Sequence, residues 1–431
     1  SSSSSQTKSS EGETVVSDTS KESGESISST PVTSDRTKIT VMMEASESSE
    51  TYKMWSTLFE GFVAEKHPEI KIEYELLPND SDYANKLQLY IASNQLPDFY
   101  GCANGTFSQA AKEIDAIVNV GEELKRIDKY DDMNGAVIDF LTDAEDEELY
   151  LFPNGLYCEF FFYRTDIFEA NNLKAPTTWN EFLDVCEKLK QAGEIPCVIA
   201  GAEQWQIMRY LSFAPWRNTH DKFIMGFIDG TETFAANSGA QVGVNLVKTM
   251  GENEYWQPGF TATNYTDATN MFFSGQGAMF YSGSGHIEKA KELYADGKLG
   301  MFPVPAVDDM ENIDTDVPIH AGFANAFNKQ TYDEVMQEFF EYLCDHYHEV
   351  TYANGVFSPF TYDPPEGLDK LFYDIEPMFE SAQNSWVSWD DKLDSATVVE
   401  MEDAQEELAL GMITPEKFSE EMDAAVRANN P

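Results

Sequence analysis

The segment SWVSWDD (385–391) places two tryptophans three residues apart with a pair of carboxylates beside them. An indole ring can bury about 150–250 Å² of apolar surface, and a carboxylate accepts hydrogen bonds from polar groups. A helix stripe that only packs in a core would normally use Leu or Ile and would not place paired acids next to it. We therefore predict that Trp386 or Trp389 contacts a ligand, with Asp390 as an acceptor; core packing is the alternative.

Three more candidates stand where predicted strands end, which is where open α/β sheets hold their ligands. Glu44 directly follows the apolar run ITVMM, and its alternative role is a helix N-cap. Asn104 follows LPDFYG, and its alternative role is a turn residue with left-handed backbone. Tyr157 lies in NGLYC between two apolar runs, where core packing is the alternative.

Two further tryptophans, an arginine and two serines complete the candidates. Trp205 follows the strand-like run IPCVIAG, and Trp216 stands next to Arg217 in FAPWRN. Either ring could stack on a ligand or pack in the core, and the arginine could hold a hydroxyl group or pair with a surface acid. Ser282 and Ser284 belong to SGSG, a glycine-rich end to the apolar run AMFY.

Motifs for enzyme chemistry and metal binding are missing from the sequence. Acidic pairs such as Glu147–Glu148 are frequent, but adjacency along the chain does not place two carboxylates across a substrate. His346 and His348 are two apart on a predicted helix and point to different faces. YDDMNGAVIDF (130–140) lacks the first carboxylate and the closing Glu of a calcium loop. We expect no enzyme activity, no cofactor and no metal.

The charge and the cysteines limit the partners of the protein. The 431 residues carry 76 acidic and 28 basic side chains, a net charge of −48, which repels nucleic acid and anionic membranes. No run of about 18 apolar residues is present, so we expect no transmembrane helix. Five cysteines form no metal-ligand spacing, and their odd number leaves at least one unpaired or bonded between chains. Cys186 falls on the apolar face of a predicted helix, which indicates a core position.

The first part of the folded chain predicts a parallel sheet. Apolar strands at 39–43, 70–77 and 96–101 alternate with helices, and the first helix carries an apolar stripe that includes Trp55 and Phe62 at helical spacing. This βαβαβ order is typical of a parallel sheet with helices on its faces. At this length, two or three domains are expected.

The second part repeats this logic with a different sequence. Strands are predicted at 149–153, 159–163 and 195–201. Thr178 and Glu181 predict a capping box at one helix start, and Thr331 and Glu334 predict another before residues 335–343. Thr414-Pro415 predicts the start of the last helix. Short strands near 302–304 and 319–327 could return to the first sheet, which would make the domain boundary discontinuous.

The first 34 residues contain 14 serines and almost nothing that could enter a core. This composition predicts a flexible linker over residues 1–36. A linker at the start of the chain predicts that a signal peptide and a lipid-bearing cysteine precede it; a disordered cytosolic tail is the alternative.

The chain resembles the extracellular solute-binding proteins of ABC importers, in the carbohydrate-binding group that includes maltose-binding protein. The resemblance covers roughly residues 38–426, and its segments come in the family's order. These segments are FVAEKHPEIKIEYE (62–75), YANKLQLYIASNQLPDF (83–99), FYRTDIFEANNLKAPTTWNEFLDVCEKLKQAG (162–193), FFSGQGAMFYSGSG (272–285) and AQEELALGMITPEKFSEEMDAAV (404–426). One departure is Gly285-His286, where many members carry a tryptophan.

This resemblance implies an α/β fold of two doubly wound lobes joined by a multi-strand hinge, the type II periplasmic-binding-protein-like fold. The lobes would comprise residues 37–152 with about 300–327, and residues 153–299 with 328–431. An oligosaccharide would bind between them and pass to the permease subunits of an ABC transporter. Asn104 and Tyr157 match positions where the family contacts sugar, and SGSG would line the cleft from the second lobe.

The resemblance also implies the setting of the protein. It would be a monomeric lipoprotein on the cell surface of a Gram-positive bacterium, with no nucleic acid partner. Three alternatives remain: a secreted glycoside-active enzyme, a binding protein for a peptide or polyamine, and an adhesin or structural surface module. The negative charge is compatible with a cationic ligand.

Overall fold

The computed structural model describes residues 35–380 and 388–431. Arg36–Pro431 form one compact unit. The serine-rich segment 1–34 and Trp386 lie outside the described residues, so the linker and the ligand contact predicted there stay predictions. None of the described helices is both long and apolar enough to cross a membrane.

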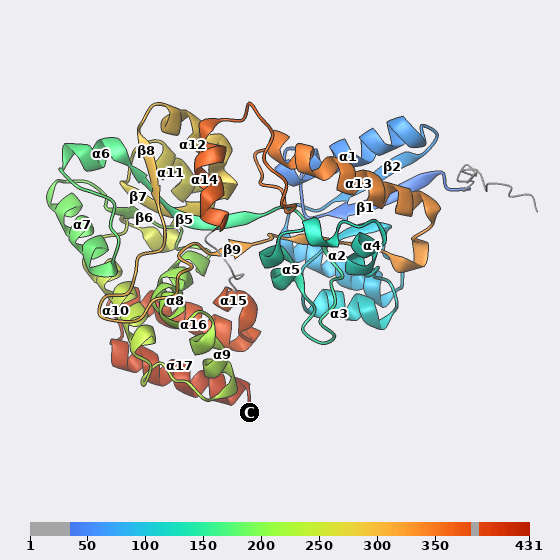
Figure 1. Cartoon of the computed structure of the whole chain (residues 1–431). Coiled ribbons are helices and arrows are strands. Elements are labelled where there is room, and N and C mark those ends of the chain that lie inside the picture. The colour runs from blue at the N-terminus through green and yellow to red at the C-terminus, as the bar shows by residue number, and fades with distance from the viewer. Residues whose placement is uncertain (1–34, 381–387) are drawn as a thin grey trace, which may run out of the picture. The chain divides into compact units, whose positions relative to one another are not determined.

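The start of the folded chain is βαβαβ, as its hydrophobic pattern predicts, and Figure 1 shows these elements in blue and cyan. The strands β1, β2 and β3 are parallel, and β10 joins them antiparallel from far along the chain. The sheet has the order β2-β1-β3-β10-β4, with β1 (Lys38–Met43), β2 (Lys71–Leu76), β3 (Phe99–Cys102), β4 (Phe152–Pro153) and β10 (Ala324–Phe327).

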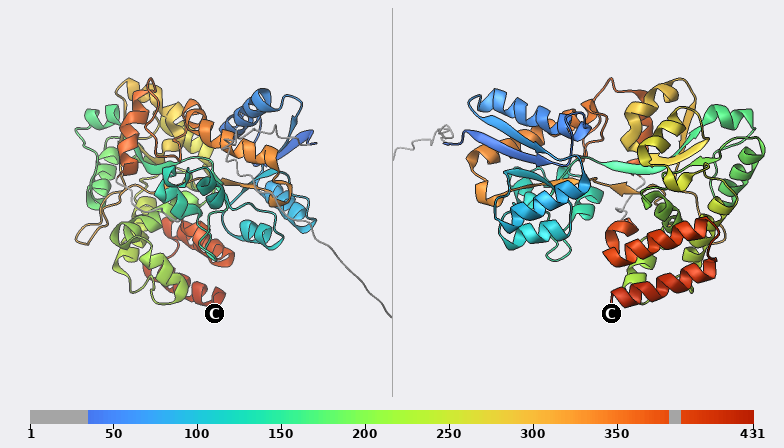
Figure 2. Two further views of the ribbon diagram at one scale, coloured as in Figure 1. Left: turned by 45° about the vertical axis from the view of Figure 1, so that its right-hand side comes forward. Right: turned by 180° about the vertical axis from the view of Figure 1, so that it is seen from behind.

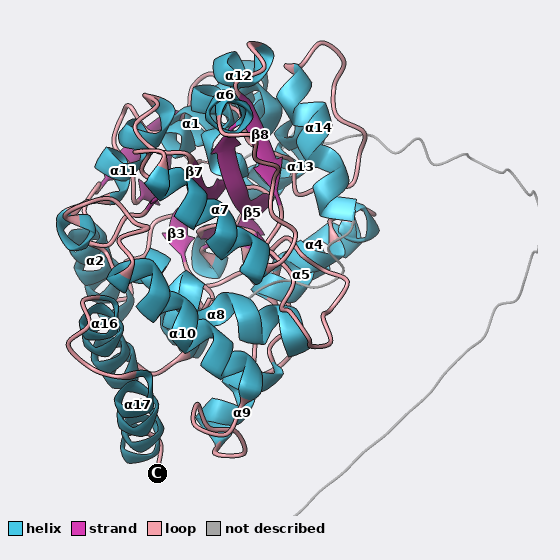
Figure 3. Ribbon diagram, turned by 90° about the vertical axis from the view of Figure 1, so that its left-hand side faces the viewer, coloured by secondary structure: helices cyan, strands magenta, loops and turns pink. Residues whose placement is uncertain are grey.

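A second sheet is built around the long strand β5. It has the order β6-β7-β5-β8, and β9 also pairs with β5. In Figure 3, its strands (magenta) lie among helices. Its members are β5 (Tyr157–Arg164), β6 (Cys197–Val198), β7 (Met279–Gly283), β8 (Leu299–Phe302) and β9 (Ile319–His320).

The residues MFYSG form β7, and all five of them are buried. Its pairing is mixed, because β7 runs parallel to β6 and antiparallel to β5. The strand ends at Gly283, whose φ of +151° suits glycine. A Cβ atom at this position would lie 2.1 Å from the carbonyl oxygen of Cys158. Glycine therefore allows β7 to approach β5 closely at the end of the strand.

Helices cover both sheets. In Figure 2, α16 and α17 lie side by side at the C-terminal end of the chain, and both pack against α10. The α-helices are α1 (Glu50–Lys66), α2 (Asp80–Ala92), α3 (Thr106–Glu113), α4 (Val120–Arg126), α5 (Gly135–Leu141), α6 (Thr165–Ala170), α7 (Trp179–Gln191), α8 (Trp205–Thr219), α9 (Lys222–Asp229), α10 (Ser238–Glu252), α11 (Tyr265–Phe273), α12 (Ile287–Ala295), α13 (Glu334–Ala353), α14 (Lys370–Glu380), α15 (Trp389–Lys392), α16 (Ser395–Ala409) and α17 (Pro415–Asn429); four 3₁₀ turns are η1 (Tyr130–Asp132), η2 (Phe260–Ala262), η3 (Ser284–His286) and η4 (Lys329–Thr331).

The apolar stripe of α1 is buried, which confirms the helical spacing seen in the sequence. Phe59 stacks on Phe339 of α13 with ring centroids 4.2 Å apart. The cysteines are also buried and all five are free thiols, with Cys186 in the core as predicted. Burial raises the pKa of the Cys197 thiol to about 12, which keeps it protonated and unreactive.

Two predicted helix starts are confirmed and one is wrong. Thr178 caps α7 by accepting from the Glu181 N–H at 3.2 Å, and Thr414 caps α17 with Pro415 at its first position. The carboxylate of Glu181, however, accepts from Thr177. The capping box predicted from Thr331 does not form, because Thr331 ends the 3₁₀ turn η4 and Asp333 caps α13.

The predicted domain boundaries stay a prediction. β10 completes the first sheet, whereas β8 pairs with β5 in the second. α13, at 334–353, packs against α1. The chain therefore passes between the two parts three times. It does so in residues 153–157, in residues 302–324 and after α13, which ends at Ala353.

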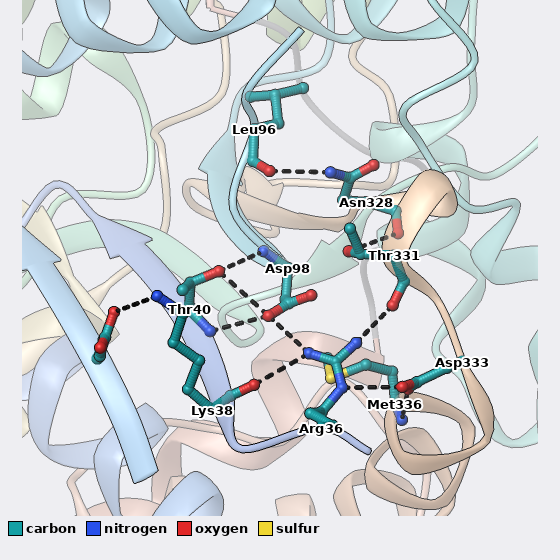
Figure 4. Close-up of polar contacts among 10 residues, drawn as sticks. Arg36, Lys38, Thr40, Leu96, Asp98, Asn328, Thr331, Asp333 and Met336 are labelled. Atoms are coloured by element: carbon teal, nitrogen blue, oxygen red, sulfur yellow. Dashed lines mark hydrogen bonds and ion pairs between the residues drawn. The ribbon is translucent and has the colours of Figure 1, made fainter. Parts of the chain in front are cut away.

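A buried carboxylate fixes the first strand where the folded unit begins (Figure 4). Asp98 accepts hydrogen bonds from the Thr40 N–H at 2.9 Å and the Thr40 hydroxyl at 3.1 Å, and pairs with the Arg36 guanidinium at 2.8 Å. Arg36 also pairs with Asp333 at 2.9 Å and donates to the carbonyl oxygen of Thr331. These contacts join β1, the turn before β3 and the start of α13.

We predict that Asp98→Asn lowers the free energy of unfolding by about 3 kcal/mol, because it removes one of the two carboxylates that pair with the largely buried Arg36 guanidinium and weakens the contacts to Thr40. The measurement is urea denaturation at neutral pH. The matched control is Asp115→Asn, which removes an exposed ion pair with Lys329 and is expected to cost less than about 1 kcal/mol. Equal losses in the two variants would contradict the role given to Asp98.

Candidate functional site

A pocket of about 290 Å³ opens where the N-terminal end of β5 meets the end of β7, β9 and the first turn of α8. Tyr157 and Glu159 come from β5, His320 from β9, and Ser282 and Gly283 from β7. The sheet register sets this arrangement, because Tyr157 pairs with His320 and Glu159 pairs with Gly283. Backbone pairing of β5 with β7 and β9 therefore brings these pocket residues together.

Glu159 and Arg209 form a buried ion pair on the pocket wall. The Arg209 Nε donates to Glu159 Oε1 at 3.0 Å, and its Nη2 approaches Oε2 at 3.4 Å. The Tyr281 hydroxyl also donates to Oε1, at 2.7 Å. Burial alone would raise the pKa of Glu159, but the Arg209 guanidinium, followed by His320, lowers it to about 2. The carboxylate is therefore ionised, and both of its oxygens are engaged.

His320 is held as a defined tautomer between Glu159 and the backbone. Its Nδ1 accepts from the Gly322 N–H at 3.1 Å, so Nε2 is the ring nitrogen that carries a proton toward Glu159. Nε2 stands 3.4 Å from Glu159 Oε2. The imidazole also stacks on the ring of Tyr157, with centroids 5.4 Å apart and planes at 12°. The Tyr157 ring is thus held on one side by a fixed imidazole.

Trp205 presents the largest aromatic surface of the pocket. It opens α8, and Arg209 lies four residues later on the same helix face. The Arg209 guanidinium sits over the indole at 5.0 Å from the ring centroid, within the range of a cation–π contact. The same guanidinium pairs with Asp390 at 3.3 Å. The ion pair thus fixes both the position and the orientation of the indole.

Tyr265 supports Trp205 from a second direction. It is the first residue of α11, and its ring lies 5.3 Å from the indole. Its hydroxyl lies 3.1 Å from the Ser282 hydroxyl and 2.6 Å from the His286 Nε2. Burial, with a smaller contribution from Lys289, lowers the pKa of His286 to about 4, so this ring is neutral at pH 7. A neutral imidazole here can accept a hydrogen bond from the Tyr265 hydroxyl.

A second, smaller pocket of about 50 Å³ lies at the end of β1 and β3 in the first sheet. Glu44 borders it, directly after β1. Burial, followed by the nearby carboxylate of Asp80, raises the pKa of Glu44 to about 7. A carboxyl group in this state can donate as well as accept a hydrogen bond.

The structure brings several of the predicted site residues together. Tyr157, Trp205 and Ser282 line the larger pocket. Ser284 lies next to it, buried, and its hydroxyl accepts from the Cys158 N–H at 3.1 Å. Asp390 reaches the pocket only through its ion pair with Arg209. For these residues, ligand contact remains the prediction made from the sequence.

The other predicted residues lie elsewhere. Asn104 is exposed and donates to the carbonyl oxygen of Thr142 at 3.0 Å. Trp216 is buried within α8, and Trp389 packs against Phe223 and Phe234 in the core. Arg217 donates to the carbonyl oxygens of Ile313 and Thr315 and so fixes a loop.

Five pocket residues were missed in the sequence: Cys158, Glu159, Arg209, Tyr265 and His320. Glu159 offered a signal, because it is the only charged residue in the apolar run EFFFY. Arg209 offered another, four residues after Trp205. Nothing near Tyr265 or His320 in the sequence points to a pocket, because β-pairing and helix packing bring them there.

This arrangement fits binding better than catalysis. The pocket offers aromatic rings next to polar groups that are already oriented by other protein groups. Its one carboxylate is ionised and paired, so it is a poor proton donor or nucleophile. Among the described residues, no cluster of three metal-ligating side chains is present.

The family comparison decides the class of protein. Residues 45–345 match the family described as bacterial extracellular solute-binding protein. The chain belongs to this family. The family match confirms the resemblance seen in the sequence. The similar solved structures confirm the type II periplasmic-binding-protein-like α/β fold.

Similar proteins give context to this solute-binding protein. It is 22% identical over 164 residues to the multiple sugar-binding protein of Streptococcus mutans, a match over 37% of this chain and 39% of that relative's length. In fold it is similar to a chitin oligosaccharide binding protein, with TM-score 0.75, 20% identity and coverage of 92% and 100% of the two chains. It is also similar to RafE in complex with raffinose, with TM-score 0.69, 18% identity and coverage of 91% and 100%. At these identities, the two structures show the fold alone.

We predict that Glu159→Gln lowers the free energy of unfolding at pH 7 by about 3 kcal/mol, because it breaks a buried ion pair. Glu159 ionises near pH 2 when folded and near 4.5 when unfolded. The stability that it contributes is therefore fully present above about pH 4.5 and is lost as the pH falls through 2.

Urea denaturation at pH 7, 4 and 3 measures this effect, and the difference between wild type and variant should shrink as the pH falls. Glu73→Gln, which removes only an exposed pair with Lys38, is the control and should cost less than about 1 kcal/mol. A difference between Glu159→Gln and wild type that stays constant with pH would refute the ionised, paired state of Glu159.

Proposed function

We propose that this solute-binding protein captures an oligosaccharide at the Trp205 pocket and delivers it to the membrane permease of an ABC transporter. The observation that carries the proposal is the oriented indole of Trp205 next to fixed polar groups. A sugar ring has an apolar C–H side that an indole can cover and hydroxyl groups that need hydrogen-bonding partners. The pocket offers both within about 290 Å³.

The polar groups of the pocket suit a neutral ligand. Glu159 is compensated by Arg209, and His320 carries its proton on Nε2 facing that carboxylate. A cation stacking on Trp205 would meet the guanidinium that already lies over the same ring. These contacts favour a sugar over the peptide or polyamine considered from the sequence.

The names of the relatives agree with this ligand class. They describe a multiple sugar-binding protein, a chitin oligosaccharide binding protein and a raffinose complex. The extracellular family name fits capture outside the cell. The permease partner, the monomeric state and the lipid anchor remain part of the proposal.

Sugar binding would act through closure of the two lobes. A ligand that binds the closed state more tightly than the open state shifts the population toward closure. A dissociation constant near 1 μM corresponds to about −8 kcal/mol, within reach of two stacked rings and their hydrogen bonds. The permease would recognise the closed form.

We predict that calorimetry with the whole chain detects binding of at least one of maltotriose, xylotriose, mannotriose, chitotriose or raffinose, without product formation. Trp205→Ala should weaken the affinity for that sugar by roughly 30-fold or more, which corresponds to about 2 kcal/mol. The reason is the loss of the stacking surface.

Tyr130→Ala is the matched control, because Lys125 lies over the Tyr130 ring at 4.9 Å outside both pockets; it should leave the affinity unchanged. Hydrolysis of the sugar would favour the enzyme alternative. Binding of spermidine in place of every sugar would favour the polyamine alternative.

A further inference from the structure

The smaller pocket at the end of β1 contains two asparagines that are almost completely buried. Asn154 is 6% exposed and Asn325 is 1% exposed, and both border the pocket together with Glu44 and Thr51. Asn154 follows β4, and Asn325 lies in the middle of β10. Buried amides normally find partners for all of their polar atoms.

Neighbouring groups fix the orientation of both amides. The Trp55 Nε1 can only donate, so the Asn154 atom that it meets at 2.9 Å is the oxygen. The Phe152 carbonyl can only accept, so the Asn325 atom that faces it at 3.3 Å is the nitrogen. The same nitrogen donates to Asn154 Oδ1 at 2.7 Å. Neither amide can flip without losing these bonds.

With the amides in this orientation, one donor group and one acceptor atom have no hydrogen-bond partner in the described part of the chain. Asn154 Nδ2 and Asn325 Oδ1 have no hydrogen-bond partner among the described residues. The Thr51 hydroxyl, on the same pocket wall, has none there either. These groups border one small space, and the two amides are held in fixed orientations, so a hydroxyl group placed there could pair with a donor and an acceptor at once.

The size of the pocket limits what can occupy it. A volume of about 50 Å³ is more than the roughly 10–15 Å³ that one water molecule needs in a cavity, so the pocket can hold a small polar group of a ligand. Part of the wall is bare backbone at Gly101, where a Cβ atom would lie 2.7 Å from the Phe323 ring. The pocket is therefore suited to a small group such as a hydroxyl or a hydroxymethyl group.

The two pockets are linked through the chain. Tyr157 of the larger pocket is three residues from Asn154, so these two residues are at most about 10 Å apart along the backbone. His320 of the larger pocket and Asn325 are likewise joined by one short segment. A ligand longer than a single sugar ring could reach from the Trp205 pocket to the asparagine pair.

We propose that Asn154, Asn325 and Thr51 form a second binding site that reads one hydroxyl-bearing group at the end of the ligand. The site rests on the proposed function, because the rest of the same oligosaccharide occupies the Trp205 pocket. Asn154 Nδ2 donates a hydrogen bond to the oxygen of the ligand hydroxyl group, and Asn325 Oδ1 accepts a hydrogen bond from the same group. Glu44, beside them, can accept or donate in turn.

Calorimetry on the whole chain tests the site, with whichever of maltotriose, xylotriose, mannotriose, chitotriose or raffinose binds wild type most tightly as the probe. Asn154→Asp replaces the free donor by an acceptor and keeps the oxygen that Trp55 and Asn325 need. Thr51→Val removes only a hydroxyl. Asn134→Asp is the matched control, because it makes the same change at the N-cap of α5, where Asp caps equally well.

Asn154→Asp should weaken the affinity at least tenfold and Thr51→Val about threefold, with Asn134→Asp unchanged. If Asn154→Asp melts below the assay temperature, Thr51→Val decides. Affinities at the wild-type level in both variants, with binding lost in Trp205→Ala, would mean that water alone occupies the pocket and would overturn this site while the proposed function stands. No binding of any probe by wild type would overturn both.

Discussion

The buried pair of Glu159 and Arg209 is the interaction on which the larger pocket depends. A carboxylate in the middle of a sheet is costly unless an opposite charge and hydrogen bonds compensate it. Arg209 provides that charge, and in doing so it ties the first turn of α8 to β5. Because Trp205 is one helical turn before Arg209, the same contact places the indole against the guanidinium and beside Tyr265. The ion pair thus helps to position the Trp205 indole on the pocket wall.

The first sheet uses its buried polar groups differently. Asp98 and Arg36 connect β1, the turn before β3 and the start of α13, which is a role in stability. Asn154 and Asn325 are also buried, but the Asn154 amide nitrogen and the Asn325 amide oxygen have no partner among the described residues. The two asparagines border the smaller pocket, whereas Asp98 borders neither of the two pockets described above.

Sequence reasoning found the parts of the fold that depend on local pattern. The βαβαβ start, the apolar stripe of α1 and the caps of α7 and α17 follow from periodicity and from cap chemistry. The wall of the pocket does not, because His320 reaches Tyr157 through antiparallel pairing over more than 160 residues of chain. Trp216 and Trp389 look like stacking platforms in isolation, yet helix packing buries both. Trp205 differs only in its position at the first turn of α8, which the sequence does not show.

The charge of −48 does not describe the pocket. Charges on the surface are screened over about 8–10 Å at physiological salt, whereas the groups that face a bound ligand are few and mutually compensated. Glu159 is neutralised by Arg209, and Glu44 has a pKa of about 7, so it is uncharged in a large share of molecules at neutral pH. Of the two carboxylates on the described pocket walls, the fully ionised one is already paired with Arg209. The acidic composition therefore acts mainly on solubility and on encounter with charged surfaces.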